Sequence, residues 1–175
     1  DEVIDYSKMI ADTTKRTSTL FTNLLDWAAS QTGELIMKHV INNLDECLDE
    51  TIALLQDHQQ RKNITILRDN TNINISADPN GLKTVLRNLI SNALKFTPHD
   101  GMIEISVEKN SDEVVVSISD SGVGIKSELI PQIFKTDTYI TTDGTDDEHG
   151  TGIGLSLCKE MIARHNGKIW AESKL

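Results

Sequence analysis

The sequence contains no apolar run that approaches the roughly 20 residues needed to cross a membrane, and its first ten residues, DEVIDYSKMI, are too acidic for a secretory signal. Cysteine is scarce as well. Cys47 and Cys158 each fall inside an apolar helical pattern, which indicates reduced core thiols of a cytoplasmic protein. No spacing typical of a zinc site occurs. We therefore expect a cytoplasmic chain that makes no membrane contact of its own.

Positive charge is also in short supply. The 17 lysines and arginines are outnumbered by 27 acidic residues, for a formal net charge of −10. Because the phosphates of nucleic acids demand a basic surface, this balance argues against a nucleic-acid partner. Any anionic ligand must be held by local positive charge and not by the field of the whole molecule.

The first 30 residues contain neither proline nor glycine, and their apolar positions recur at alternating steps of three and four. This spacing predicts one long helix that ends near Gly33. A heptad helix of this length usually packs on a partner helix, although it can also pack on its own domain. The positions that form the seam are Val3, Tyr6, Ile10, Thr13, Thr17, Leu20, Leu24 and Trp27.

From residue 34 onward, helical and strand patterns alternate, and the chain is long enough for one substantial core. We expect an α+β fold, an α/β sandwich whose mixed, antiparallel-rich sheet is covered by helices on one face. The expected strands are 35–40, 64–67, 73–76, 102–109, 113–119 and 168–172, with the fourth and fifth joined as a hairpin. The expected helices are 43–61, 79–96, 128–134 and 151–165.

Helix 79–96 carries two asparagines among its apolar residues. Asp78 is a plausible N-cap and Pro79 suits the first helical position. Asn88 and Asn92 are four residues apart and so share one side of the helix, where an unsatisfied amide costs about 1–3 kcal/mol. Their amide oxygens can complete the oxygen shell of Mg²⁺, and Lys95, one turn further on, can reach a phosphate. Alternatively, the two amides cap neighbouring backbone groups.

Two glycine-rich segments follow. In the first, DSGVGI at 120–125, Asp120 at a strand end can accept a hydrogen bond from an exocyclic amine such as that of adenine, and the glycines permit close approach of a flat ring. By itself this segment is equally a tight turn. The second, GTGIGL at 150–155, leads into a helix whose first amide groups can bind an anion. It fits neither the dinucleotide fingerprint nor the P-loop.

Taken together and in this order, the three segments resemble the N, G1 and G2 boxes of the Bergerat (GHKL-type) ATP-binding fold, and NLISNALKFTP is similar to the N box of sensor histidine kinases. By this resemblance, 1–33 would be the second helix of the dimerisation and phosphotransfer hairpin, and 34–175 the catalytic ATP-binding domain without its C-terminal strand.

The resemblance also implies roles for individual residues. Asn92 would hold Mg²⁺ with help from Asn88, Lys95 would contact phosphate, and Asp120 would bind the adenine amine. Phe96 would line the adenine site, and glycines of the last segment would wrap the phosphates. The full set of implied ATP-binding residues is Asn88, Asn92, Lys95, Phe96, Asp120, Gly122, Gly124, Ile125, Gly150, Thr151, Gly152, Gly154 and Leu155.

Asn88 also separates branches of this superfamily. Gyrase, the heat-shock chaperone and the mismatch-repair ATPases carry a glutamate here, which activates water. An amide cannot take a proton at neutral pH, whereas phosphoryl transfer to a neutral imidazole needs no base at this position. The resemblance therefore favours a kinase that transfers the γ-phosphate to a histidine, for relay to an aspartate of a response regulator.

Three departures qualify this expectation. None of the five histidines lies in the family's His-acid-Leu-Arg-type acceptor motif, so the acceptor helix would lie upstream or in trans, in a homodimeric protein whose sensor can be membrane-bound. We expect this chain to bind ATP without phosphorylating itself.

The loop 135–149 carries Asp137, Asp143, Asp146, Asp147 and Glu148 against Lys135 alone, which predicts a solvated, mobile lid and weak, magnesium-dependent binding. By the resemblance, the chain would stop before the family's final sheet strand, so that we expect either that this strand lies outside the sequence or that the sheet is incomplete. A degenerate nucleotide-binding or dimerisation module without kinase activity is the alternative.

Overall fold

The computed structural model describes residues 37–135, 142–146, 148 and 150–174, together with six isolated positions among the first 36 residues. The chain divides into two units, Asp1–Ile36 and Met37–Leu175. Apart from those six positions, the expected N-terminal helix lies outside the described residues and stays a prediction. Within the described part, no helix combines the length and the apolar character that a membrane span requires.

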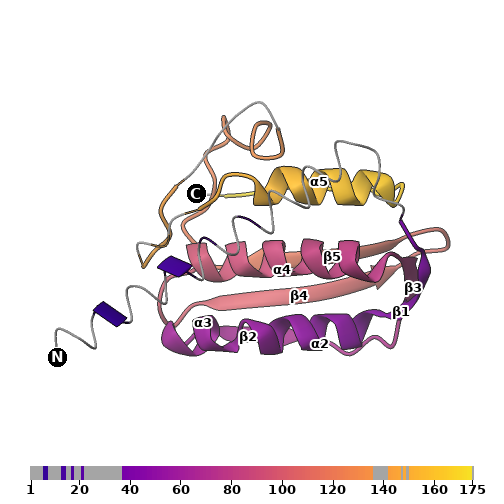
Figure 1. The fold of residues 1–175 in the computed structure, drawn as a ribbon, viewed down its shortest axis with the longest axis horizontal. Coiled ribbons are helices and arrows are strands. Elements are labelled where there is room, and N and C mark those ends of the chain that lie inside the picture. The colour runs from indigo at the N-terminus through magenta and orange to yellow at the C-terminus, as the bar shows by residue number, and fades with distance from the viewer. Residues whose placement is uncertain are drawn as a thin grey trace. The chain divides into compact units, whose positions relative to one another are not determined.

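The second unit alternates short strands with helices, as the sequence predicts (Figure 1). Its strands are β1 (Val40–Asn43), β2 (Thr65–Arg68), β3 (Asn74–Ala77), β4 (Met102–Lys109) and β5 (Val114–Asp120). Its helices are α2 (Leu44–Leu54), α3 (Gln56–Arg61), α4 (Pro79–Phe96) and α5 (Gly154–Arg164).

The described strands form two sheets. β1 pairs with β3 in antiparallel register, and the other sheet has the order β2-β4-β5. In that sheet β2 runs parallel to β4, whereas β4 and β5 form the expected antiparallel hairpin, with Ile103 opposite Asp120 and Lys109 opposite Val114. The mixed α+β class and the predominance of antiparallel pairing are therefore confirmed.

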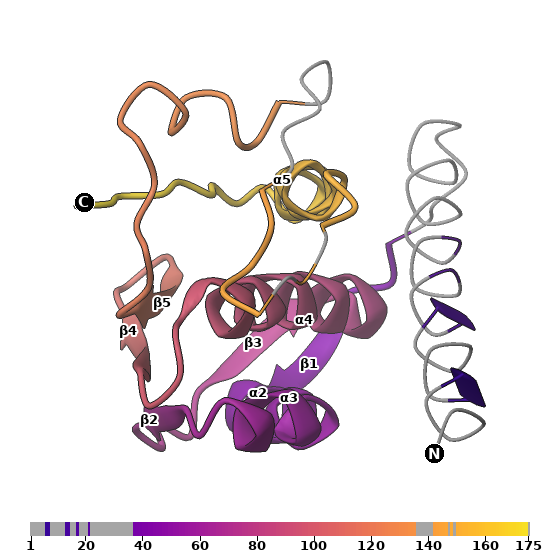
Figure 2. The ribbon, with the colours of Figure 1, turned by 90° about the vertical axis from the view of Figure 1, so that its left-hand side faces the viewer.

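Helices cover one side of the β4–β5 hairpin. Helix α4 lies between α5 and α2, with the hairpin to one side of it (Figure 2). The core lies between these layers, and each of its fully buried aliphatic side chains contributes about 1.5–3 kcal/mol relative to an exposed position. Its most deeply buried members are Leu44, Leu48, Ile90, Leu94, Ile103 and Ile105.

Helix α4 begins and ends where local chemistry predicts. The Asp78 carboxylate accepts a hydrogen bond from the Gly81 N–H at 2.9 Å, and Pro79 occupies the first turn. At the other end, Thr97 is extended and its hydroxyl donates to the Ala93 carbonyl at 2.7 Å. Because Pro98 follows, the residue before it is driven away from helical conformation.

Several expected elements differ in the structure. Helix 43–61 is interrupted at Leu55, because α3 buries no side chain that would hold it in line with α2. Residues 128–134 form successive hydrogen-bonded turns, since Pro131 has no N–H to continue a helix. The strand expected at 35–40 lies at Val40–Asn43, where β3 offers a partner. No strand forms at 168–172, and α5 begins at Gly154, three residues later than expected.

Candidate functional site

Three segments that are far apart in the sequence meet on helix α4. A Cβ atom added to Gly122 would lie 2.6 Å from the Phe96 carbonyl oxygen, and one added to Gly154 would lie 2.7 Å from Asn88 Oδ1. A Cβ atom added to Gly150 would lie 2.9 Å from Lys95 Nζ. Such distances are far below van der Waals contact, so glycine permits the close approach at all three positions. The fold thus brings the three predicted segments together along one helix.

The two asparagines of α4 have different surroundings. Asn88 Nδ2 donates to the Thr84 carbonyl at 2.8 Å, while its Oδ1 faces Gly154. Asn92 is half-buried, and its amide makes no hydrogen bond to any residue that the structure describes. The backbone-capping alternative therefore applies to Asn88 but not to Asn92. The oxygen of Asn92 is free to serve as a ligand of a hard cation such as Mg²⁺.

No carboxylate, histidine or cysteine cluster competes for this role. Among the described residues, no group of three or more such side chains could hold a metal ion. The residues present fit Mg²⁺ only in the manner of a nucleotide site, in which neutral amide oxygens complete a shell made mostly of phosphate oxygens and water. Asn92, with Asn88 beside it, is the part of the chain suited to this.

Lys95 is a partly desolvated cation beside the second glycine segment. Its Nζ donates to the Thr142 carbonyl at 2.6 Å and lies 4.7 Å from the centre of the Phe96 ring, a cation–π distance. Burial lowers the pKa of Lys95 below its ordinary value, although the nearby carboxylates of Glu148 and Asp143 act in the opposite direction. An incoming phosphate would restore the electrostatic stabilisation that burial removes.

The 120–125 segment turns back from β5 onto the end of α4. Asp120 is exposed, and its Oδ1 accepts the Gly122 N–H at 2.9 Å, so the tight-turn reading is correct. Val123 N–H donates to the Phe96 carbonyl at 3.3 Å. Gly124 has a φ of 72°, which favours glycine, and the next amide, Ile125 N–H, donates to Ser173 Oγ at 2.8 Å. The second Asp120 oxygen makes no hydrogen bond to a described residue.

The third segment, 150–155, places the start of α5 beside α4. Gly152 has a φ of 68°, and Thr151 and Leu155 are half-buried beside it. Ile153 precedes α5 and provides no side-chain acceptor for its first amide groups. Those N–H groups carry the positive end of the helix dipole and remain available for an anion.

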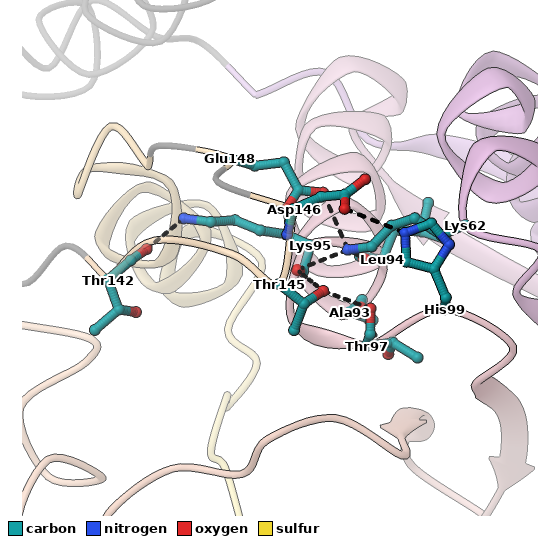
Figure 3. Close-up of polar contacts among 10 residues, drawn as sticks. All are labelled: Lys62, Ala93, Leu94, Lys95, Thr97, His99, Thr142, Thr145, Asp146 and Glu148. Atoms are coloured by element: carbon teal, nitrogen blue, oxygen red, sulfur yellow. Dashed lines mark hydrogen bonds and ion pairs between the residues drawn. The ribbon is translucent and has the colours of Figure 1, made fainter.

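The structure also places at this site Lys62 and Thr145, which sequence reasoning missed, and Glu148, which it named only as one of the acids of the loop 135–149. Lys62, Thr145 and Glu148 form a hydrogen-bonded cluster around the C-terminal end of α4 (Figure 3). No sequence signal distinguishes Lys62, since a lysine after a helix usually extends into solvent. Its partner Glu148 is 86 positions away and lies within an acidic run.

The expectation that the acids of 135–149 are simply solvated is wrong for Glu148, whereas Asp146 is exposed to solvent. Glu148 pairs with Lys62 at 3.0 Å, and Asp146 lies 3.1 Å from His99 Nε2. Gly144 N–H donates to the Glu148 carbonyl, which closes this part of the loop on itself. Asp137 and Asp147 lie outside the described residues. The described part of the loop is thus held by specific pairs with Lys62, which follows α3, and with His99, which follows α4.

Known proteins share this arrangement of sequence and fold. Residues 77–175, which contain every site residue predicted from the sequence, match the family model described as histidine kinase-, DNA gyrase B- and HSP90-like ATPase. The chain is 30% identical over 173 residues to the circadian input-output histidine kinase CikA of Synechococcus elongatus, covering 97% of this chain and 23% of that protein. It is 32% identical over 159 residues to the adaptive-response sensory kinase SasA of Gloeothece citriformis, covering 89% and 40% respectively.

Solved structures of histidine kinases have a fold similar to that of this chain. The second unit resembles the catalytic domain of histidine kinase ThkA, with a TM-score of 0.67 and 35% identity over 77% of this chain and 86% of that one. The complex of ThkA with the response regulator protein TrrA matches with a TM-score of 0.72 and 29% identity, covering 97% of this chain and 47% of that one. The chain spans less than half the length of the two curated relatives named above.

Proposed function

Because the chain belongs to the family of histidine kinase-, DNA gyrase B- and HSP90-like ATPases, as the ATP-binding catalytic domain of a two-component histidine kinase, we propose that its protein transfers the γ-phosphate of ATP to a histidine outside this chain. The phosphate then passes to an aspartate of a response-regulator receiver domain. The observation that carries the proposal is the approach of the two glycine segments, 120–125 and 150–155, to α4, around Lys95 and the Asn92 amide, which has no partner among the described residues.

The site offers groups suited to bind both the base and the phosphates of ATP. The base lies against Asp120, Phe96 and the segment Gly122, Gly124 and Ile125, where the unpaired Asp120 oxygen accepts the adenine amine. The phosphates lie between Lys95 and the amides of Gly150, Thr151, Gly152, Gly154 and Leu155. Mg²⁺, held by Asn92 with Asn88 beside it, neutralises phosphate charge when bound.

Asn88 directs the chemistry toward transfer to a histidine. Its nitrogen donates to the Thr84 carbonyl, so the amide is fixed in the helix and has no basic atom to activate water. A neutral imidazole is already a nucleophile and needs no base here. The chain's own contribution is therefore to bind the triphosphate, orient it and stabilise its charge.

The partners follow from the same proposal. The acceptor helix lies upstream or on a second chain, and residues 1–33 supply the second helix of a dimerising hairpin. ThkA has been solved in complex with the response regulator TrrA, which supports a receiver domain as the recipient of the phosphate. The alternative, a nucleotide-binding or dimerisation module without transfer, predicts the same ATP binding but no phosphorylation of an added acceptor domain.

The test of the nucleotide site is calorimetric titration with ATP in the presence and absence of Mg²⁺. We expect Asn92→Ala to abolish magnesium-dependent ATP binding, because the variant removes the amide of the α4 pair that makes no hydrogen bond to a described residue. Asn80→Ala, which changes an exposed asparagine in the first turn of the same helix, is the matched control and should bind as the wild type does. Undiminished ATP affinity in Asn92→Ala would refute the assignment of the metal ligand.

A further inference from the structure

Lys62 is a lysine in the protein interior. Only 2% of its side chain is exposed, and a buried ammonium is costly unless its hydrogens are all paired. Its Nζ donates to the Leu94 carbonyl at 2.9 Å, the Lys95 carbonyl at 3.0 Å and Glu148 Oε1 at 3.0 Å. These three acceptors use all three donors of the ammonium group. The surroundings of this position therefore suit a buried lysine side chain specifically.

Two of these acceptors belong to the last turn of α4. The carbonyls at a helix C-terminus have no partner within the helix and carry the negative end of its dipole, so a cation is favoured there. Lys62 follows α3 directly, whereas Glu148 belongs to the segment before Gly150. The ammonium thus joins α3, α4 and the 142–148 segment at one point (Figure 3).

Glu148 organises the segment that lies on α4. Its Oε2 accepts the Asp146 N–H at 2.9 Å, and its carbonyl accepts the Gly144 N–H at 2.8 Å. Thr145 lies between Gly144 and Asp146 in the sequence. It donates to the Lys95 carbonyl from its N–H at 3.1 Å and from Oγ1 at 3.2 Å. Thr145 Oγ1 also lies 2.9 Å from the Thr97 carbonyl.

Lys95 is therefore held at both ends by the cluster. Lys62 Nζ and the Thr145 N–H both donate to its carbonyl. The Thr145 hydroxyl is shared between this carbonyl and that of Thr97, and Lys95 Nζ is directed to Thr142 at the start of the same segment. Two residues beyond Glu148, Gly150 lies against Lys95 Nζ. The atoms proposed to meet phosphate are thus positioned through the Lys62–Glu148 pair.

We propose that Lys62 and Glu148 are positioning residues for nucleotide binding: their ion pair fixes Lys95 and Gly150 where they meet the phosphates. The inference rests on the proposed ATP site and adds to it two residues that contact no nucleotide. It differs from a purely structural role, because a structural pair would affect folding without distinguishing the phosphate end of the ligand from its base.

The experiment measures the affinity of the chain for MgATP and for adenosine by calorimetry. We expect Lys62→Met and Glu148→Gln to weaken MgATP binding about tenfold, with adenosine affinity unchanged. The matched control is Lys83→Met, which breaks an exposed ion pair with Glu50 near the N-terminal end of α4, about three turns before Lys95, and should alter neither affinity. Equal losses for ATP and adenosine would overturn the positioning role.

Two further variants keep the test decisive. Thr145→Val removes hydrogen bonds to the Lys95 and Thr97 carbonyls without stranding a buried charge, so it reports on the cluster even if Lys62→Met does not fold. In a Lys95→Met background, Lys62→Met should cause a smaller loss of ATP affinity than it causes in the wild type, because the part of its effect that passes through Lys95 is already gone. Fully additive losses would contradict the proposal.

The outcomes also separate this inference from the proposed function. A wild-type chain that binds no MgATP contradicts the proposed function and, with it, the positioning role. If the wild-type chain binds MgATP and the folded Lys62→Met and Thr145→Val variants bind it equally well, only the positioning role is contradicted.

Discussion

Asn88 and Asn92 carry the same side chain one helical turn apart, yet the fold uses them differently. The first is satisfied by the helix itself, through the Thr84 carbonyl, and its oxygen abuts Gly154. The second has no partner among the described residues and lies on the half-buried side of α4. A half-buried unpaired amide costs free energy in the absence of ligand. Such a cost is consistent with a group reserved for binding.

At the same scale, the charge state of Lys95 leads to a prediction about pH. Burial holds its pKa below the ordinary 10.5, and bound phosphate favours the protonated form. Affinity for MgATP should therefore be full while Lys95 is protonated and should fall as the pH rises through this lowered pKa. Calorimetry between pH 7 and pH 10.5 would show the decline. Lys95→Met should bind more weakly and lack this pH dependence; an identical alkaline decline in that variant would assign it to another group.

Among the elements, α4 is the platform of the site. Its last turn contacts Gly122 through the Phe96 carbonyl, and its middle contacts Gly154 through Asn88. Because the helix is rigid and packed against α2, α5 and β5, it fixes the separation between the two glycine segments. The base end and the phosphate end of a nucleotide are thereby held at a set distance.

Gly122→Ala tests this packing. The new methyl group would lie 2.6 Å from the Phe96 carbonyl oxygen, a backbone atom that cannot turn aside, so the 120–125 segment must shift. We expect at least about tenfold weaker ATP binding, as displacement of positioned groups by an ångström can be this costly. Calorimetry measures it. Gly167→Ala, at the end of α5, meets mainly the Ile162 side chain and should leave affinity unchanged; equal losses in both variants would mean general destabilisation.

Asp45 in the first turn of α2 and Asp78 at the N-cap of α4 lead to a prediction about how the free energy of unfolding depends on pH. Burial alone would raise the pKa of Asp45 and of Asp78, but hydrogen bonds from backbone N–H groups hold the pKa of both below the ordinary 3.8, and Arg68 contributes at Asp45. A carboxylate with a lowered pKa in the folded state stabilises the fold above its unfolded pKa, and this stability is lost as the pH falls through the folded value.

Asp78→Asn should therefore be less stable than wild type at pH 7 by up to about 1 kcal/mol, the typical interaction of a carboxylate with the N-terminal end of a helix. The difference should shrink as the pH falls below about 4 and vanish below the folded pKa. Urea denaturation at several pH values between 7 and 2.5 measures it. A difference that stays constant over this range would show that the charge of Asp78 is not the cause.

For the whole molecule, the net charge of −10 and an anionic ligand are compatible because positive groups are concentrated locally. Lys95 and the uncapped amides of α5 face the site, while Lys62 neutralises Glu148 close by. Two histidines already have structural roles: His165 accepts the Asp78 N–H at 2.9 Å, and His99 pairs with Asp146. Neither is placed as a phosphate acceptor.

We therefore expect the chain, incubated with γ-labelled MgATP, to remain unlabelled, and an added acceptor domain with a phosphotransfer histidine to gain acid-labile label. Autoradiography after gel electrophoresis measures both. Asn92→Ala should abolish labelling of the acceptor, while Asn80→Ala should retain it. Acid-labile label on this chain alone would contradict the expectation, and an unlabelled acceptor despite ATP binding would favour the non-kinase alternative.

Much of the fold could be predicted wherever it depends on local interactions. The bounds of α4 follow from Asp78, Pro79 and Pro98, and the β4–β5 hairpin follows from alternation around a polar turn. Predictions failed where tertiary context or a single residue overrode the pattern. Pro131 broke the short helix, and residues 168–172 had a strand pattern but formed no ladder.

What the sequence alone determined is the identity and order of the chemical groups, because an N-cap, an i, i+4 asparagine pair and glycine spacings are encoded over a few residues. Only the tertiary structure decided that Gly122, Gly150 and Gly154 converge on α4 and that Lys62 is buried against Glu148, 86 positions away. The physical reason is that a buried charge pair and a close backbone approach depend on which distant segments share a location, and no local pattern records this.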